Sequence, residues 1–269
     1  MKLRYLLLMM IMGSSLLLPG TVRAHRSVQS VEVEEAFPLV SRLQQFDQLF
    51  AAWTDETYII EPGGNANNKV VYLTFDDGPD PQWTPLVLEQ LARHHAKATF
   101  FVIGRSARSE PQTILSVAEA GQMIGNHAYN HISLADLGWT DFYLELGDTN
   151  QAIRDALADK PELLTQVAEC MRPPYGEVTP DVYTFAYRMH YDVSFWSLDT
   201  MDWSGISAKE ILDTVLQGVK PGSIILMHDG PKDRGETVKG LGLVLHELTL
   251  RGYSFPSLCT ADGQVIAYP

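Results

Sequence analysis

The chain contains 269 residues, of which 45% are hydrophobic and 20% are charged. This length and composition are typical of a globular domain with a substantial core and argue against a small disulfide-stapled module or a flexible tail. With 33 acidic and 20 basic residues, the formal net charge is −13 at pH 7. Such a surface repels polyanions, so we expect no nucleic acid partner and no anionic phosphate polymer, whereas a neutral sugar polymer meets no electrostatic objection.

The beginning of the chain has the pattern of a secretory signal peptide. Lys2 and Arg4 precede an apolar run over residues 5–18, and residues 22–24 offer small side chains at the cleavage positions. We therefore predict a signal peptide over residues 1–24 and an exported protein, periplasmic or secreted. The alternative is an uncleaved anchor, although the run is shorter than the roughly 20 residues of a spanning helix. No later segment is apolar enough to span a membrane, so we expect no span in the mature chain.

Residues 25–66 are predicted to form an N-terminal helical extension. Apolar residues recur with helical spacing from Phe37 to Trp53, and the string EPGGNANN then breaks the pattern. Its apolar face would pack on the main domain, which we place at residues 67–269.

From Lys69 onward, short apolar runs alternate with amphipathic stretches, which predicts an α/β fold with parallel strands joined by helices. We expect strands at Val70–Leu73, Ala98–Ile103, Gln122–Ile124, Glu169–Met171, Asp192–Ser197, Ser223–Met227 and Tyr253–Phe255. We expect helices at Thr84–His94, Pro111–Ala120, Asp141–Ala158, Pro180–Met189, Ser207–Val219 and Glu236–Leu250. Pro180 follows Thr179 at one helix start, and Ser207 with Glu210 makes a capping box at another. Seven strands with intervening helices indicate a barrel smaller than the eight-fold form.

Cys170 and Cys259 are the only cysteines, too few for a disulfide framework and too far apart in sequence for a zinc ribbon. They could form a disulfide in an oxidising compartment or remain two buried thiols, and both alternatives stay open.

Polar clusters follow five of the predicted strands. They are TFDDG after the first, NHAYNH after the third, residues 172–175 after the fourth, residues 199–203 after the fifth and residues 228–229 after the sixth. The carboxyl ends of the strands in a parallel βα barrel open on one face, so these clusters should converge there.

Two of the clusters contain the groups of a hydrolytic metal site. His127 and His131 are four residues apart and can face one point, and one carboxylate of the Asp76–Asp77 pair can complete a two-histidine, one-carboxylate site with open coordination positions. The other carboxylate would stay free beside the metal, as a general base requires.

The same segments resemble, in order, the five motifs of the NodB-type polysaccharide deacetylases, carbohydrate esterase family 4. They are TFDDG, the H-x-x-x-H of His127 and His131, RPPYG at 172–176, DTMDW at 199–203 and LMH at 226–228. The resemblance covers roughly residues 69–258 and implies a distorted seven-stranded (β/α) barrel. It also implies removal of N-acetyl or O-acetyl groups from sugars with a divalent metal, often zinc. One departure is Ala128, which stands where many members have Ser or Thr, so a hydroxyl contact is absent.

The resemblance assigns the metal ligands and the base. Asp77, His127 and His131 would hold the metal, and Asp76 would take the proton of the attacking water. Arg172 resembles the family residue that pairs with this base. Zinc is the expected metal, although cobalt, manganese and nickel also suit the ligand set.

The resemblance also assigns the groups that act on the rest of the acetamide. The backbone N–H of Tyr175 would stabilise the oxyanion, and His228 would protonate the departing amine, oriented by Asp202. Trp203 and Leu226 resemble the residues that line the acetyl-methyl pocket.

We therefore expect a metal-dependent enzyme that removes N-acetyl groups from a polymer or oligomer containing N-acetylglucosamine, of the peptidoglycan or chitin type. One alternative is an O-acetyl esterase on an acetylated polysaccharide such as xylan. The other is a glycan-binding barrel without activity. Substrate choice is expected to depend on rim loops such as Gly104–Ser109, Leu134–Thr140 and Pro231–Gly240. The sequence indicates no protein partner and no oligomeric state.

Overall fold

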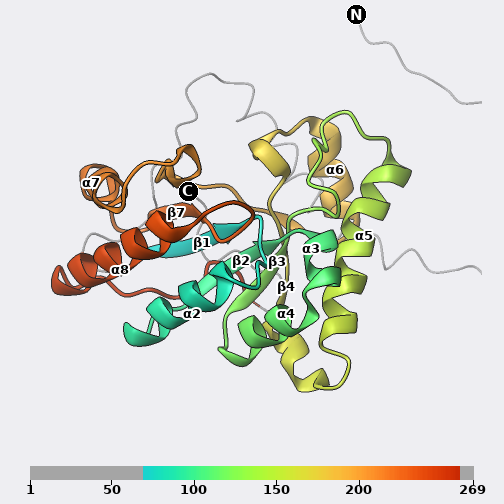
Figure 1. The fold of residues 1–269 in the computed structure, drawn as a ribbon. Coiled ribbons are helices and arrows are strands. Elements are labelled where there is room, and N and C mark those ends of the chain that lie inside the picture. The colour runs from blue at the N-terminus through green and yellow to red at the C-terminus, as the bar shows by residue number, and fades with distance from the viewer. Residues whose placement is uncertain (1–68, 261–269) are drawn as a thin grey trace, which may run out of the picture. The chain divides into compact units, whose positions relative to one another are not determined.

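The computed structural model describes residues 69–260, in which one curled sheet of parallel strands is covered by helices (Figure 1). The strands are β1 (Tyr72–Asp76), β2 (Ala98–Val102), β3 (Met123–Asn126), β4 (Val167–Met171), β5 (Asp192–Val193), β6 (Leu198–Asp199) and β7 (Ile224–His228). Their order across the 7-stranded sheet is β5-β4-β3-β2-β1-β7-β6. The predicted α/β class is therefore confirmed. The predicted signal peptide and helical extension, residues 1–24 and 25–66, lie outside the described residues.

Helices cover the outer face of the sheet. They are α2 (Trp83–Arg93), α3 (Gly104–Ser109), α4 (Pro111–Glu119), α5 (Trp139–Ala156), α6 (Pro180–Arg188), α7 (Ala208–Gly218) and α8 (Gly235–Leu250), with short 3-10 turns at Pro161–Gln166, Pro174–Gly176 and Asp202–Ser204. Contacts between helices run in the order α7, α8, α2, α4, α5 and α6, which follows the strand order beneath them (Figure 1). All six predicted helices are present, and the predicted caps of α6 and α7 form. Within residues 69–260, no helix combines the length and apolarity needed to cross a membrane.

Two strand predictions are wrong. Of the strand predicted at Asp192–Ser197, only Asp192–Val193 form a strand, β5. The next strand, β6, begins after this segment at Leu198, and the two strands lie at opposite edges of the sheet. Ser194 N–H donates to the carbonyl of Met171 in β4 at 2.8 Å, and Ser197 N–H donates to the carbonyl of Ile224 in β7 at 3.0 Å. A link of this length reaches at most about 14 Å, so the two edges must approach each other and the sheet curls into a barrel.

The last predicted strand, Tyr253–Phe255, is only an isolated bridge between Ser254 and Val70. This segment forms backbone hydrogen bonds with the residues that precede β1, and Ser254 N–H donates to the carbonyl of Lys69 at 2.8 Å. The structure therefore still has seven strands, because β6, which was not predicted, is present and the predicted strand Tyr253–Phe255 is absent.

The strands alternate between two cores, because successive side chains point to opposite faces. On β1, Leu73 and Phe75 join the large core beneath the helices, whereas Tyr72 joins a smaller core inside the barrel. The same alternation assigns Thr74 and Asp76 to the inner face. The interior is thus apolar at the amino ends of the strands and polar at their carboxyl ends.

A disulfide joins Cys170 of β4 to Cys259 within the inner core. Both residues are buried, and the N–H groups of Leu258 and Cys259 donate to Thr99 Oγ1 at 3.2 and 3.3 Å. The C-terminal segment therefore fills the amino end of the barrel, and the disulfide fixes it there. Of the two alternatives for the cysteines, the structure has the bonded one.

Loss of the disulfide should destabilise the fold. The bond closes a loop with a sequence separation of 89 residues, and cross-links of this kind typically contribute about 2–5 kcal/mol to the free energy of unfolding. We expect the double variant Cys170→Ala, Cys259→Ala to unfold at a lower urea concentration than the oxidised wild type. A reductant should lower the midpoint of the wild type and leave that of the variant unchanged. Equal midpoints for the oxidised wild type and the variant would contradict a stabilising role.

Candidate active site

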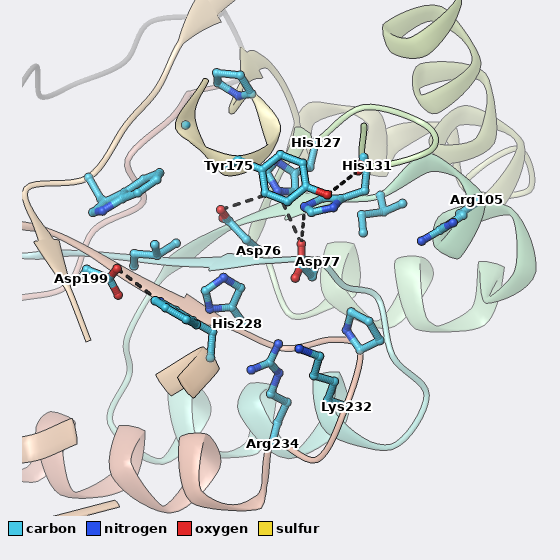
Figure 2. A pocket seen from close by; sticks show the side chains of 17 residues that line it. Asp76, Asp77, Arg105, His127, His131, Tyr175, Asp199, His228, Lys232 and Arg234 are labelled. Atoms are coloured by element: carbon cyan, nitrogen blue, oxygen red, sulfur yellow. Dashed lines mark hydrogen bonds and ion pairs between the residues drawn. The ribbon is translucent and has the colours of Figure 1, made fainter. Parts of the chain in front are cut away.

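A pocket of about 560 Å³ opens at the carboxyl ends of the strands (Figure 2). Asp76 ends β1 and His228 ends β7. Eight predicted site residues line the pocket: Asp76, Asp77, His127, His131, Tyr175, Trp203, Leu226 and His228. The other two, Arg172 and Asp202, lie behind it and contact Asp76 and His228. The structure thus brings all ten residues to one place.

Three of these side chains converge on one point. Nε2 of His131 lies 3.0 Å from Asp77 Oδ1, and Nε2 of His127 lies 3.5 Å from the same oxygen. The three potential ligand atoms lie within 4.8 Å of one another. Burial alone would raise the pKa of Asp77, but the electrostatic attraction of the two adjacent imidazoles holds it below its usual range.

The donor set fits a divalent cation. Nδ1 of His127 lies 2.7 Å from the carbonyl oxygen of Arg172, which can only accept, so Nδ1 carries the proton and Nε2 presents its lone pair. Asp77 Oδ1 is buried and has no hydrogen-bond donor among the described residues. Lone pairs that face one another in a buried site repel, and a cation bound between them would remove that conflict.

Glu145 of α5 holds the loop that carries both histidines. Its carboxylate accepts hydrogen bonds from the backbone N–H groups of Tyr129 and Asn130 at 2.9 and 2.8 Å, and from the Asn130 side chain at 2.6 Å. The loop needs this support because His131 has a left-handed backbone with φ of 56°. Glu145 was not among the residues predicted from the sequence. The pattern that could have indicated it is a charged residue beside Leu146 on the buried face of an amphipathic helix.

Asp76 is paired with the fully buried guanidinium of Arg172. Nη1 of Arg172 donates to Asp76 Oδ1 at 2.8 Å and to Thr74 Oγ1 at 2.9 Å, and Nη2 donates to the carbonyl of Phe195 at 2.6 Å. Burial lowers the pKa of Arg172, and the neighbouring Asp76 carboxylate opposes that shift. The pairing occupies Oδ1 of Asp76, while Oδ2 lies 3.8 Å from Nε2 of His127. One carboxylate oxygen therefore faces the candidate metal site.

His228 is held by Asp202 on the neighbouring side of the pocket. Nδ1 of His228 lies 2.8 Å from Asp202 Oδ1, and Asp202 Oδ2 accepts from the His228 N–H and from Thr237 Oγ1, each at 2.9 Å. Burial alone would lower the pKa of His228, but the hydrogen bond and charge of Asp202 raise it above its ordinary value. The same contact lowers the pKa of Asp202 despite burial. In the sheet, His228 is the register partner of Asp76.

The remaining predicted residues form the walls. Tyr175 has a left-handed backbone with φ of 62°, and its N–H donates no backbone hydrogen bond within residues 69–260. Leu226 is buried on β7, whereas Trp203 is 48% exposed and donates through Nε1 to Asp199 Oδ2 at 3.3 Å. Trp203 is therefore not a core residue.

The glycine of TFDDG has a packing role that the sequence analysis did not assign. A Cβ on Gly78 would lie 2.4 Å from both carboxyl oxygens of Asp229, so only glycine fits beside this buried group. Burial raises the pKa of Asp229 to about 7, and Thr84 Oγ1 donates to its Oδ2 at 2.6 Å.

The rim differs from its prediction in three places. Gly104–Ser109 is the helix α3 rather than a loop. Leu134–Thr140, expected as a rim loop, provides no residue to the described pocket, and Pro231–Gly240 provides lining residues only before α8 begins. The pocket is also lined by residues that were not predicted as site residues, among them Trp196, Asp199, Arg105, Lys232 and Arg234.

Comparisons with known proteins agree with this architecture. A family model described as polysaccharide deacetylase matches residues 63–194. A chitooligosaccharide deacetylase of Sinorhizobium fredii is 40% identical over 207 residues, which cover 73% of this chain and 94% of the relative. A peptidoglycan-N-acetylglucosamine deacetylase of Bacillus cereus is 34% identical over 212 residues, which cover 77% of this chain and 74% of the relative.

A solved structure agrees as well. The crystal structure of a peptidoglycan N-acetylglucosamine deacetylase superposes with a TM-score of 0.67 at 34% identity, covering 72% of this chain and 88% of that one. This match bears out the barrel that the resemblance implied, with its parallel strands and surrounding helices. By its fold, its motifs and these relatives, the chain belongs to the polysaccharide deacetylase family, carbohydrate esterase family 4.

Proposed function

We propose that the chain hydrolyses the N-acetyl groups of glycans that contain N-acetylglucosamine. The observation that carries this proposal is the register pairing of Asp76 with His228 beside the Asp77, His127 and His131 cluster. Amide hydrolysis needs both a proton acceptor for water and a proton donor for the amine. The named substrates of the relatives, peptidoglycan N-acetylglucosamine and chitooligosaccharides, agree with it.

Asp77, His127 and His131 would hold a divalent metal, for which zinc is our proposal because two imidazoles and a carboxylate suit it. When bound, such an ion polarises the acetamide carbonyl and makes water more acidic. Asp76 accepts the proton of the attacking water through Oδ2, because Oδ1 is occupied by Arg172. Arg172 therefore acts as a positioning residue for the base.

The departing amine needs a proton, because an amide anion is a very poor leaving group. His228 supplies it from Nε2, because Nδ1 is engaged by Asp202. The raised pKa of His228 keeps more of it in the imidazolium form at neutral pH. The Tyr175 N–H is a donor for the oxyanion, and Leu226 and Trp203 shape the space for the acetyl methyl group.

We further propose that the protein works outside the cytoplasm, periplasmic or secreted. The support is the charged and apolar pattern of residues 1–24, the Cys170–Cys259 disulfide, which persists in oxidising compartments, and glycan substrates of the kind that the relatives' names give.

Acetate release tests the proposed chemistry. Oligomers of N-acetylglucosamine and peptidoglycan should release acetate, chelation should abolish release, and zinc should restore it. Chelation should also lower the thermal midpoint of the wild type, because a bound ion stabilises the folded state. Asp76→Asn should reduce kcat by about 10²–10⁴-fold without loss of metal binding. Activity that survives both metal removal and Asp76→Asn would refute the mechanism.

The pH dependence tests the role of Asp202. In Asp202→Asn the carboxylate charge is lost, and burial then lowers the pKa of His228. Because the acid must be protonated, activity is lost as pH rises through this pKa, and the alkaline limb of kcat/KM should move to lower pH in the variant. A variant whose alkaline limb coincides with that of the wild type would remove Asp202 from this role.

Amide and ester substrates distinguish the proposed activity from the O-acetyl esterase alternative. An alkoxide leaves with less help than an amine, so His228→Ala should lose about 10²–10⁴-fold on acetamide substrates and far less on acetyl esters. Parallel kcat measurements on acetylated xylan and N-acetylglucosamine oligomers make the comparison. A wild type that cleaves esters only would overturn the amide assignment.

A further inference from the structure

One side of the pocket carries three cations that the deacetylation chemistry does not use. Arg105 of α3 and the pair Lys232 and Arg234, from the loop between β7 and α8, line the pocket. Figure 2 shows Lys232 and Arg234 beside each other below His228, with Arg105 beyond Asp77. We refer to Arg105, Lys232 and Arg234 as the cationic side. Its presence is unexpected on a chain with a net charge of −13.

Arg234 is the strongest part of this feature. It is only 3% exposed, its Nη2 donates to the carbonyl of Gly230 at 2.9 Å, and its buried Nε has no hydrogen-bond partner among the described residues. Burial of a guanidinium without a counterion is costly. Unlike the enclosed Nε, Nη1 is not fully covered and forms no hydrogen bond with a described residue, so this end of the guanidinium is left for an anion.

The acids of the same loop do not neutralise it. Asp229 accepts from Thr84 Oγ1 at 2.6 Å, and Asp233 Oδ1 accepts from the Gly235 N–H at 2.9 Å. Within residues 69–260, Arg234 forms no ion pair with either.

Lys232 and Arg105 extend the positive charge toward solvent. Both are exposed, and neither forms an ion pair with a described residue. Lys232 has a left-handed backbone with φ of 89°, which is unfavourable for a side chain of this size and recurs where loops hold functional groups.

The acids of the pocket are, by contrast, already engaged. Asp76 is paired with Arg172, and Asp77 faces the two histidines. Asp199 accepts from the Met201 N–H at 2.8 Å and from Trp203, and it lies on the opposite side of the view from Arg105 (Figure 2). The pocket is thus polarised, with the three cations on one side and the hydrogen-bonded carboxylate of Asp199 on the other.

We propose that the cationic side binds a carboxylate carried by the sugar unit next to the one that is deacetylated. This proposal rests on the proposed function, since it places the acetamide beside Asp76 and His228. A carboxylate matches the geometry of a guanidinium in two parallel hydrogen bonds. The acidic protein surface opposes a densely charged phosphate polymer, but it allows a glycan with one carboxylate per repeat. The preferred substrate is then an acidic glycan rather than a neutral one.

Binding of matched tetrasaccharides tests the proposal. The probes are β-linked tetrasaccharides in which N-acetylglucosamine alternates with N-acetylmuramic acid or with glucuronic acid, and their counterparts with the carboxyl reduced to an alcohol. Dissociation constants are measured by calorimetry on metal-loaded Asp76→Asn, in which turnover is slow. At low ionic strength, at least one carboxylated probe should bind about tenfold more tightly than its reduced counterpart, and added salt should reduce this ratio. The two carboxylated probes distinguish a lactyl ether from a uronic acid.

Variants on this background assign the preference to the three residues. We expect the affinity of the carboxylated probe relative to its reduced counterpart to fall toward one in each of Lys232→Gln, Arg105→Gln and Arg234→Gln. The affinity for the reduced probes should stay unchanged. Arg108→Gln is the matched control, because Arg108 is exposed on the same helix as Arg105 but does not line the pocket, and its ratio should stay at the parent value. If Arg234→Gln does not fold, the affinity ratios of Lys232→Gln and Arg105→Gln decide whether the cationic side binds the carboxylate.

Two outcomes would overturn the proposal: equal affinities for both members of each probe pair, or a preference that persists in all the variants. Acetate release by the wild type is scored separately. A carboxylate preference without acetate release would contradict the proposed activity and support the carboxylate site. Acetate release without the preference would support the activity and contradict the carboxylate site.

Discussion

The parallel register of β1 and β7 is the constraint on which the candidate active site depends. It sets Asp76 beside His228 and Thr74 beside Leu226, so the proposed base, the proposed acid and an apolar wall follow from one alignment. A shift by one residue would turn all of these side chains from the interior to the helix-covered face. The residues that fix this register are apolar: Leu73, Phe75 and their neighbours pack beneath the helices. The chemistry at the strand ends is therefore positioned by hydrophobic packing below it.

Buried charge is the second requirement. Arg172 and Asp76 are both withdrawn from water, and a pair of this kind depends on further hydrogen bonds to offset its burial. Thr74 and the Phe195 carbonyl supply two of them, whereas Nε of Arg172 has no partner among the described residues. The Phe195 carbonyl comes from the short link between β5 and β6, so barrel closure and the orientation of the proposed base depend on the same segment. The loop of the two histidines proposed as metal ligands is supported in a similar way from α5 by Glu145.

The sequence predicted the α/β class, six of the helices and the convergence of the motif residues, because hydrophobic periodicity and strand-end clusters are local signals. It did not predict that Asp192–Ser197 holds only the short strand β5 and a link to β6. A short segment of mixed apolar and polar residues, here DVSFWS, has the same pattern whether it pairs along its whole length or joins two edges of a sheet. The helix α3 is too short to show periodicity, and its start has no capping side chain. The cations of the pocket rim are scattered along the chain, so only the fold brings Arg105 to the same pocket as Lys232 and Arg234.

Anomalous diffraction at the zinc edge, from crystals grown with zinc, tests the central claim most directly. The account predicts one ion within roughly 2.0–2.2 Å of Asp77 Oδ1, His127 Nε2 and His131 Nε2, with Asp76 outside the coordination sphere and bonded to Arg172. An ion that is bound through Asp76, or that lies elsewhere in the molecule, would contradict it.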